Sequence, residues 1–259
     1  MRRVFKFLLR YTVSVASCLY LFTIGMLAAK NRKLLELICE RTRIGSRLLP
    51  SPLIPSIDPK EVVSDESAIV LPNLTAIAGN AAVIELAVMA QLVRSRRPKR
   101  LFEIGTLDGR TTLVLAANAD PDAVVYTLDL PAKDTSTKFA KASGEDFLVR
   151  PENRGARFKG TPESKKIVQL LGDSAAFDPG PALNACDFVY IDASHSYEYV
   201  LNDSRLAQRL LRNGKGIILW HDYITWDSVT QALHRLHRED PLFCSMRWIA
   251  GTSLVYSVQ

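Results

Sequence analysis

The stretch Leu101-Phe-Glu-Ile-Gly-Thr-Leu-Asp-Gly-Arg110 decides the fold of this chain, together with Val124-Val-Tyr-Thr-Leu-Asp129 further along. Each stretch carries a short apolar run that is typical of a buried strand, and the first run leads through a glycine turn into a helical pattern. The order is therefore strand, glycine turn, helix and second strand, with an acid at the end of the second strand. An α/β domain binds a ribose-bearing cofactor with this arrangement.

The spacing of the glycine turn narrows the class of cofactor. It is Glu-x-Gly-x-x-x-Gly, over Glu103–Gly109, rather than the Gly-x-Gly-x-x-Gly of dinucleotide folds. This difference favours S-adenosylmethionine over a nicotinamide cofactor. Gly105 and Gly109 have no Cβ, so the backbone can approach a ligand closely, while Glu103 can hold the loop or reach the amino group of the cofactor. Asp129 can accept hydrogen bonds from both ribose hydroxyls.

The rest of the main domain alternates helical and strand patterns. Helices are predicted over 76–95, 110–119, 197–211 and 229–237, and strands over 100–104, 124–129, 186–192 and 215–221. Residues 164–171 fit a short helix that leads to a strand at the Gly172 turn, and 243–249 with 253–258 fit a closing antiparallel pair. The polar stretch 131–162 resembles a mobile lid or an insertion. These patterns predict an α/β fold with a mostly parallel sheet, covered on both faces, whose last strand is antiparallel.

Composition and charge exclude some classes of protein. The chain has 259 residues, 47% of them hydrophobic and 23% charged, which suits one large globular domain or one domain with an extension. The net charge is +6, and much of the excess lies in the first 50 residues beside an apolar segment, which favours a lipid surface. The sequence carries no nucleic-acid-binding motif, so no nucleic-acid partner is expected. The four cysteines form no Cys-x-x-Cys pair and indicate neither a zinc site nor a disulfide framework.

The N-terminal segment 11–29 carries no charge and is flanked by Arg10 and Lys30. As a helix it would be roughly 28 Å long at about 1.5 Å per residue, which just reaches the hydrocarbon thickness of a bilayer. We therefore expect an N-terminal membrane-anchor helix over 1–33; a cleaved signal peptide and a helix that lies at the membrane interface or under a partner are the alternatives. Slightly more basic residues follow the segment than precede it, which predicts a cytoplasmic main domain. Residues 34–75 read as a Pro/Ser-rich connector.

Five motifs together resemble a known family. They are Glu103–Gly109, Asp129, Gly172-Asp173-Ser174, Ile191-Asp192-Ala-Ser-His195 and Trp220-His221-Asp222-Tyr223. From about Gly79 to Gln259 the chain resembles a class I S-adenosylmethionine-dependent methyltransferase with a Rossmann-like sheet and, more narrowly, the small bacterial branch known as methyltransferase domain 24. It is more distantly similar to metal-dependent catechol-type and macrolide-sugar O-methyltransferases. The resemblance implies a methyltransferase domain over 76–259 that binds S-adenosylmethionine through Glu103, Gly105, Thr106, Gly109, Asp129, Asp173, Ser174 and Asp192.

Two acids that follow neighbouring strands predict a metal site. Asp192 closes the predicted strand 186–192 and Asp222 follows the strand 215–221, so parallel pairing would bring both carboxylates within reach of one ion. Hard oxygen ligands with room for water and substrate suit Mg²⁺ or another divalent cation. The resemblance implies Asp-Asn after the second strand, whereas this chain has Asp222-Tyr223 preceded by His221. The third ligand is therefore either His221 or water.

A histidine takes the position of the expected catalytic base. The resemblance to catechol-type enzymes implies a lysine three residues after the metal-binding acid, and His195 stands three residues after Asp192. Because histidine titrates near neutrality, we expect His195 to remove or orient the proton of the acceptor hydroxyl. The alternatives are structural: Asp192 can cap the following helix, and His195 and His221 can be satisfied core histidines.

These observations predict a membrane-tethered S-adenosylmethionine-dependent O-methyltransferase. The resemblance implies that its acceptor is a hydroxyl on a sugar or another small metabolite. Two other classes remain: an enzyme that binds a nicotinamide cofactor, against which the glycine spacing argues, and a non-catalytic membrane-associated protein that keeps the fold. The retained Glu103, Gly105, Asp129 and Asp192 argue against the second. The sequence leaves open whether the chain forms a homo-oligomer.

Overall fold

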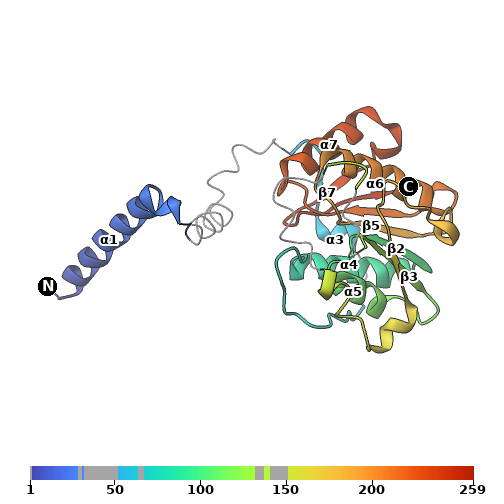
Figure 1. The fold of residues 1–259 in the computed structure, drawn as a ribbon, viewed down its shortest axis with the longest axis horizontal. Helices are drawn as coiled ribbons and strands as arrows, with labels where there is room; N and C mark the ends of the chain where they lie inside the picture. Colours follow the sequence, from blue (N-terminus) through green and yellow to red (C-terminus); the bar gives the residue numbers. More distant parts are fainter. Residues whose placement is uncertain (1, 29–30, 32–51, 64–66, 132–136, 141–150) are drawn as a thin grey trace. The chain divides into compact units, whose positions relative to one another are not determined.

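The computed structural model describes residues 2–28, 31, 52–63, 67–131, 137–140 and 151–259 (Figure 1). The chain divides into two compact units, Met1–Leu49 and Pro50–Gln259. The second unit contains the sheet and every predicted site residue.

Within the described residues, eight strands form one sheet in the order β1-β7-β8-β6-β5-β2-β3-β4. All of them run in the same direction except β8, which is antiparallel to both β6 and β7. The predicted α/β fold, with a mostly parallel sheet and an antiparallel last strand, is confirmed. The strands are β1 (Ser56–Ile57), β2 (Arg100–Ile104), β3 (Val124–Asp129), β4 (Ile167–Leu171), β5 (Phe188–Ile191), β6 (Ile217–Trp220), β7 (Arg247–Ile249) and β8 (Val255–Val258).

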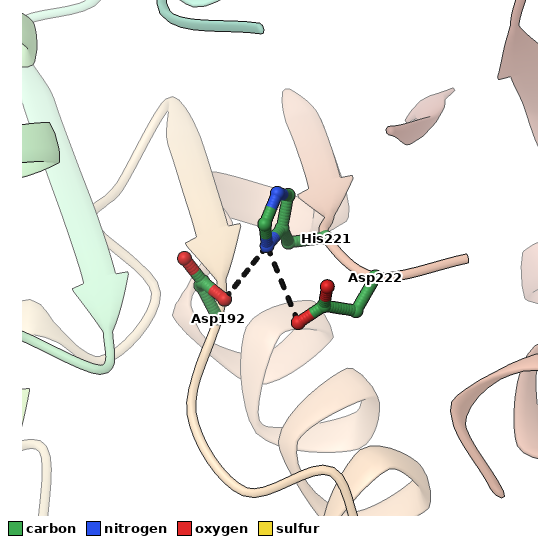
Figure 2. A group of neighbouring side chains, drawn as sticks. All are labelled: Asp192, His221 and Asp222. Atoms are coloured by element: carbon green, nitrogen blue, oxygen red, sulfur yellow. Dashed lines mark hydrogen bonds and ion pairs between the residues drawn. The ribbon is translucent and has the colours of Figure 1, made fainter. Parts of the chain in front are cut away.

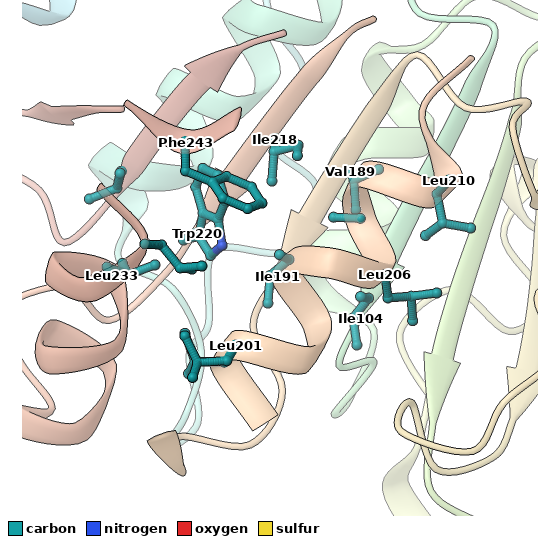
Figure 3. Close-up of a cluster of buried hydrophobic side chains, with 14 of the residues drawn as sticks. Ile104, Val189, Ile191, Leu201, Leu206, Leu210, Ile218, Trp220, Leu233 and Phe243 are labelled. Atoms are coloured by element: carbon teal, nitrogen blue, oxygen red, sulfur yellow. The ribbon is translucent and has the colours of Figure 1, made fainter. Parts of the chain in front are cut away.

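Alternation along the buried strands divides the core into two layers, one on each face of the sheet. Leu101, for example, packs in one layer and Phe102 in the other, because successive strand side chains point to opposite faces. One layer includes residues of α4 (Val83–Arg96) and α5 (Arg110–Asn118), and the other includes residues of α6 (Tyr197–Leu210) and α7 (Asp227–Glu239). Figure 3 shows part of this second layer, in which Trp220 of β6 packs among Ile191, Leu233 and Phe243.

Burial of these side chains stabilises the sheet in its register. Each fully buried large apolar side chain contributes about 1.5–3 kcal/mol. A one-residue slip of a strand would exchange its two layers, so the pattern holds the strand ends, and the loops that follow them, in place. Shorter elements complete the fold: α3 (Pro59–Val62) and the 3₁₀ turns Pro151–Asn153, Pro162–Lys166, Gly180–Ala182, Arg212–Gly214 and Pro241–Phe243.

The strand order reverses at β2, which lies between β3 and β5. In open α/β sheets ligands bind beyond the carboxyl ends of the strands at such a switch point. Gly105 follows β2 and donates its backbone N–H to the carbonyl of Leu128 at 2.8 Å, while the backbone N–H of Asp192, which follows β5, donates to the carbonyl of Ile104 at 2.8 Å. The predicted glycine loop and the first predicted metal-binding acid therefore start side by side.

The structure differs from the prediction at several boundaries. Residues 167–171, expected at the end of a short helix, form the edge strand β4, paired in register with β3. Helix α4 begins at Val83 rather than at residue 76. At this start, Glu85 accepts a hydrogen bond from the backbone N–H of Ala82 at 2.7 Å. Part of the expected connector 34–75 belongs to the second unit, because β1 pairs with β7 and Ile54 and Val62 are buried.

The segment 151–161 packs on the glycine loop. Gly155 donates its backbone N–H to the carbonyl of Leu107 at 3.0 Å, and the guanidinium of Arg157 pairs with Asp108 at 2.6 Å. The ring of Phe158 lies where a Cβ on Gly109 would be. This part of the lid predicted over 131–162 is a packed cover, while 132–136 and 141–150 lie outside the described residues.

The N-terminal helix differs from the membrane anchor predicted over 1–33. Helix α1 runs from Arg2 to Leu21 and is followed by a 3₁₀ turn, Ile24–Leu27. It therefore includes four cations in its first half, and its charge-free part, from Tyr11, is only about 16 Å long at 1.5 Å per residue. Among the residues that the structure describes, no helix has the length and apolar character needed to cross a membrane.

Candidate active site

Three predicted metal ligands meet where β5 and β6 end. Asp192 directly follows β5, and His221 and Asp222 directly follow β6, which pairs with β5 in parallel. Figure 2 shows the His221 imidazole facing both carboxylates: Nδ1 lies 3.0 Å from Asp192 Oδ1 and 3.3 Å from Asp222 Oδ2. One potential ligand atom from each residue lies within 4.8 Å of the others. Parallel pairing thus brings together acids that stand far apart in the sequence.

His221 contacts a third carboxylate on its other side. Its Nε2 lies 3.0 Å from Glu85 Oε2, on the first turn of α4. Burial lowers the pKa of His221, but the charges of Asp192 and Asp222 outweigh burial and raise it well above its usual value. Burial raises the pKa of Glu85, but hydrogen bonds from His221 and Ser253 bring it down to about 2. The protonated imidazole therefore supplies a positive charge in direct contact with all three carboxylates.

Each of the two aspartates has a further partner that orients it. Tyr190 donates its hydroxyl to Asp192 Oδ2 at 2.9 Å, and Thr225 donates to Asp222 Oδ1 at 2.9 Å. The turn that carries Asp222 is also strained, because Asp222 and Ile224 have φ values of +65° and +63°. Left-handed backbone costs roughly 1–2 kcal/mol in a residue with a Cβ. Strain of this kind is concentrated at functional sites, where the surrounding structure maintains it.

His195 forms the wall of the same pocket. Its Nε2 lies 2.7 Å from Asp222 Oδ2, and its ring stacks on Trp226 with 4.2 Å between the centroids and 8° between the planes. Burial raises the pKa of Asp222, but the charge of His221 and the hydrogen bond from His195 lower it below its usual value. The pocket is polar at Asp192, Ser194, His195, His221 and Asp222, and apolar at Ile191, Ala193, Val200, Trp220 and Val229.

Asp129 lies at the end of β3, as predicted, with its carboxylate already oriented. Oδ2 accepts from the backbone N–H of Leu107 at 3.0 Å, and Oδ1 accepts from that of Leu130 at 2.7 Å. Arg154 pairs with the same carboxylate at 3.4 Å. Burial raises the pKa of Asp129, and the charge of Arg154 opposes that rise. Two backbone donors leave further lone pairs of the carboxylate for hydroxyl donors.

Glu103 and Thr106 lie inside the domain and support the loop. Glu103 is 1% exposed and accepts hydrogen bonds from the hydroxyls of Thr112 and Thr127, the second at 2.5 Å. Thr127 also contacts the Thr106 hydroxyl at 2.7 Å. Burial raises the pKa of Glu103 to about 8, and the Thr112 and Thr127 hydrogen bonds only partly offset that rise. Of the two roles predicted for Glu103, the observed contacts are those of holding the loop.

The two glycines of the loop approach protein atoms. Gly105 has a φ of +106°, and a Cβ on it would overlap the carbonyl oxygen of Asp192. Gly109 has a φ of +84°, and a Cβ there would strike the ring of Phe158 at 2.6 Å. Their lack of a side chain is therefore required by strand-end packing and by the 151–161 cover.

The predicted adenine-side residues lie after β4. Asp173 accepts from the backbone N–H of Lys138 at 2.7 Å and from the Tyr199 hydroxyl at 2.9 Å. Ser174 is hydrogen-bonded to Asp203, which is fully buried on α6. These contacts tie the turn after β4 to α6.

Sequence reasoning missed two residues of the site, Glu85 and Tyr190. The sequence around each residue indicates a buried polar group. Glu85 is a lone acid between Ile84 and Leu86 in an apolar helical pattern, and Tyr190 places a hydroxyl in the middle of a buried strand. A buried acid or phenol requires a polar partner. The identity of that partner depends on tertiary contacts, which no local pattern contains.

Comparison with known proteins agrees with the fold. Residues 102–223, from β2 to the turn after β6, match a family described as a methyltransferase domain. No curated protein matches the chain. The methyltransferase PaMTH1 of Podospora anserina, solved with SAH bound, is 17% identical with a TM-score of 0.50, over 70% of this chain and 80% of that chain. A Staphylococcus aureus protein, provisionally assigned as a caffeoyl-CoA O-methyltransferase, is 13% identical with a TM-score of 0.53, over 70% of this chain and 85% of that chain. At these identities the structural likeness shows the fold.

The burial of Glu103 predicts a pH-dependent stability. Its pKa is about 8 in the folded chain against 4.5 for an ordinary glutamate, so the folded state holds a proton that the unfolded state releases. The contribution of Glu103 to the free energy of unfolding is fully present below pH 4.5 and is lost as the pH rises to about 8. The loss is on the order of 1.4 kcal/mol per pH unit at most. Denaturant unfolding of Glu103→Gln between pH 5 and 8 should show a flatter profile than that of the parent chain. Parallel profiles would contradict the prediction.

Proposed function

We propose that this chain, a class I S-adenosylmethionine-dependent methyltransferase by its family match and its sheet, transfers a methyl group to a hydroxyl oxygen of a small acceptor. The observation that carries the proposal is the cluster of Asp192, His195, His221 and Asp222 beside the glycine loop. Gly105 contacts the backbone of Asp192, so a methyl donor at the loop and an acceptor at the cluster would be neighbours.

The cofactor residues support S-adenosylmethionine rather than a dinucleotide. The oriented Asp129 carboxylate suits the two ribose hydroxyls, which would take the place of the Arg154 guanidinium. The glycine loop is covered by 151–161 and leads into α5. When bound, S-adenosylmethionine supplies a methyl group on a sulfonium, which is electrophilic without further activation.

The donor set of the pocket suits a divalent cation held by Asp192, His221 and Asp222. Two carboxylates and an imidazole nitrogen converge on one point, and each has a partner outside the cluster that orients it. A bound divalent ion would lower the pKa of the acceptor hydroxyl and fix its oxygen.

His195 acts in this proposal as the base. The acceptor oxygen forms a bond to the methyl carbon while the carbon–sulfur bond breaks, and the hydroxyl proton passes to His195. Asp222 orients the ring through Nε2 and stabilises the imidazolium that forms. Because transfer neutralises the sulfonium, catalysis depends chiefly on alignment of oxygen and methyl. Trp226 stacks on the His195 ring and holds its plane in place.

Cofactor binding is the first test. Titration calorimetry of the full chain should show binding of S-adenosylmethionine and none of NAD. Asp129→Asn should weaken the binding of S-adenosylmethionine at least tenfold, because the amide has one acceptor oxygen fewer and no negative charge. The control is Asp120→Asn, an acid that precedes β3, whereas Asp129 is its last residue. Binding of NAD without S-adenosylmethionine would reject the proposal.

The role of His195 is the second test. With a panel of catechols and sugars and methyl-labelled S-adenosylmethionine, His195→Gln should lower turnover by about 10²–10⁴-fold, the usual contribution of a general base. The affinity for S-adenosylmethionine should stay unchanged. Near-normal turnover would remove His195 as the base and leave the methyltransferase assignment intact.

We also propose that α1 lies on an anionic membrane surface. Lys6 and Arg10 are one turn apart on one side of the helix, with Ser14 and Ser17 along the same stripe. A basic stripe opposite an apolar one is typical of interfacial helices, which draw on both burial and charge. The exposed apolar residues of α1 include Val4, Phe7, Leu8, Tyr11, Val15 and Leu19.

Vesicle sedimentation tests this placement. The full chain should sediment with vesicles that contain phosphatidylserine and much less with phosphatidylcholine alone. Replacement of Lys6 and Arg10 by Gln should weaken binding by tenfold or more, at about 1 kcal/mol for each cation. The control replaces two exposed cations of the second unit, Lys215 and Arg238. Equal sedimentation with both lipids would contradict the proposal.

A further inference from the structure

Glu85 is surrounded by hydrogen-bond donors. It is 5% exposed, and its Oε1 accepts from both the backbone N–H and the hydroxyl of Ser253 at 2.7 Å. Oε2 accepts from the backbone N–H of Ala82 at 2.7 Å and lies 3.0 Å from His221 Nε2. The side chain thus joins the start of α4, the β7–β8 turn and the end of β6.

This arrangement sets the orientation of the His221 ring. A carboxylate only accepts hydrogen bonds, so the Nε2 that faces Glu85 carries the ring proton. Nδ1 is then directed at Asp192 Oδ1 and Asp222 Oδ2. Two carboxylate oxygens face Nδ1, so a positive charge is required there: either a second ring proton, which makes the ring an imidazolium, or a cation that replaces that proton.

The surrounding charge points the same way. Three carboxylates, from Glu85, Asp192 and Asp222, contact one imidazole in a mostly buried site. A single imidazolium offsets only one of these charges, whereas a divalent cation on Nδ1 offsets two. The carboxylate–histidine–metal relay is also the usual way in which proteins fix a metal-binding histidine.

We propose that Glu85 holds His221 as a nitrogen ligand and thereby selects a divalent transition-metal ion of the Mn²⁺–Zn²⁺ series over Mg²⁺. The inference rests on the metal at Asp192, His221 and Asp222 in the proposed function. Mg²⁺ favours an all-oxygen octahedral shell, and an imidazole favours the transition ions. Glu85 is a positioning residue, since it touches neither the ion nor the substrate.

Cobalt spectroscopy of the chelator-treated full chain tests this selectivity. Titration with Co²⁺ should give visible absorption bands, and Mg²⁺ should displace the ion only at an excess of 100-fold or more. His221→Asn, which replaces the nitrogen by an amide oxygen, should reduce that ratio below tenfold. The ratio is measured within one protein, so a partial loss of folded protein leaves it unaffected.

The positioning role has its own variants. In Glu85→Gln the amide can donate a hydrogen bond to Nε2 of His221, which allows the ring proton to move to Nδ1. The affinity for Co²⁺ should then fall by about 10-fold or more, and the Co²⁺ spectrum should change. Ser253→Ala removes another partner of Glu85 but keeps the His221 contact, so its Co²⁺ affinity and spectrum should match the parent chain. Equal losses in both variants would assign Glu85 a structural role only.

The outcomes separate this inference from the proposed function. If Mg²⁺ competes equally with Co²⁺ in the parent chain, the selectivity is overturned while the metal site stands. If neither ion binds, the metal is removed from the proposed function and the inference falls with it. Binding of S-adenosylmethionine is measured separately and does not depend on either result.

Discussion

The approach of Gly105 to the backbone of Asp192 is the contact on which the site depends. A residue with a Cβ at position 105 would overlap the Asp192 carbonyl, and its φ of +106° is one that L residues rarely adopt. The contact lets β2 and β5 end at the same level, with their neighbouring strands in register. The loop after β2 then carries residues of the proposed cofactor site, and the loop after β5 carries Asp192, the first acid of the proposed metal site. The alignment of methyl donor and acceptor that we propose follows from this backbone packing.

The charged cluster is better explained by chemistry than by stability. Burying several carboxylates and two histidines costs desolvation free energy that their mutual attraction often only balances, and apolar residues of similar volume would pack as well. Here, three carboxylates contact His221, and the turn that carries Asp222 has two residues in left-handed conformations. Concentrated charge and backbone strain at a strand-end pocket are typical of functional sites.

The sequence predicted those parts of the fold that depend on local patterns. The bounds of β2 and β3 agree with the prediction, because each is a buried apolar run between clear breaks. The edge elements were less predictable: β1 has two residues and depends on pairing with β7, and β4 has the short mixed pattern that helices and strands share. The residues predicted to follow strands lie at the strand ends because the strands themselves were predictable. Glu85 was not, because its partner His221 lies 136 residues away.

The roles proposed for His195 and His221 are compatible because both rings contact the same carboxylate. Asp222 Oδ2 contacts both rings, at 2.7 Å from His195 Nε2 and 3.3 Å from His221 Nδ1. The charge on one histidine therefore affects the protonation of the other through this oxygen. A lysine at 195 would keep a permanent positive charge next to the proposed cation and would compete with it for Asp222. A histidine can be neutral while the cation is bound and become charged only when it takes the acceptor proton. The two departures from the metal-dependent pattern that we propose, His195 as base and His221 as ligand, are therefore compatible with each other around one carboxylate, that of Asp222.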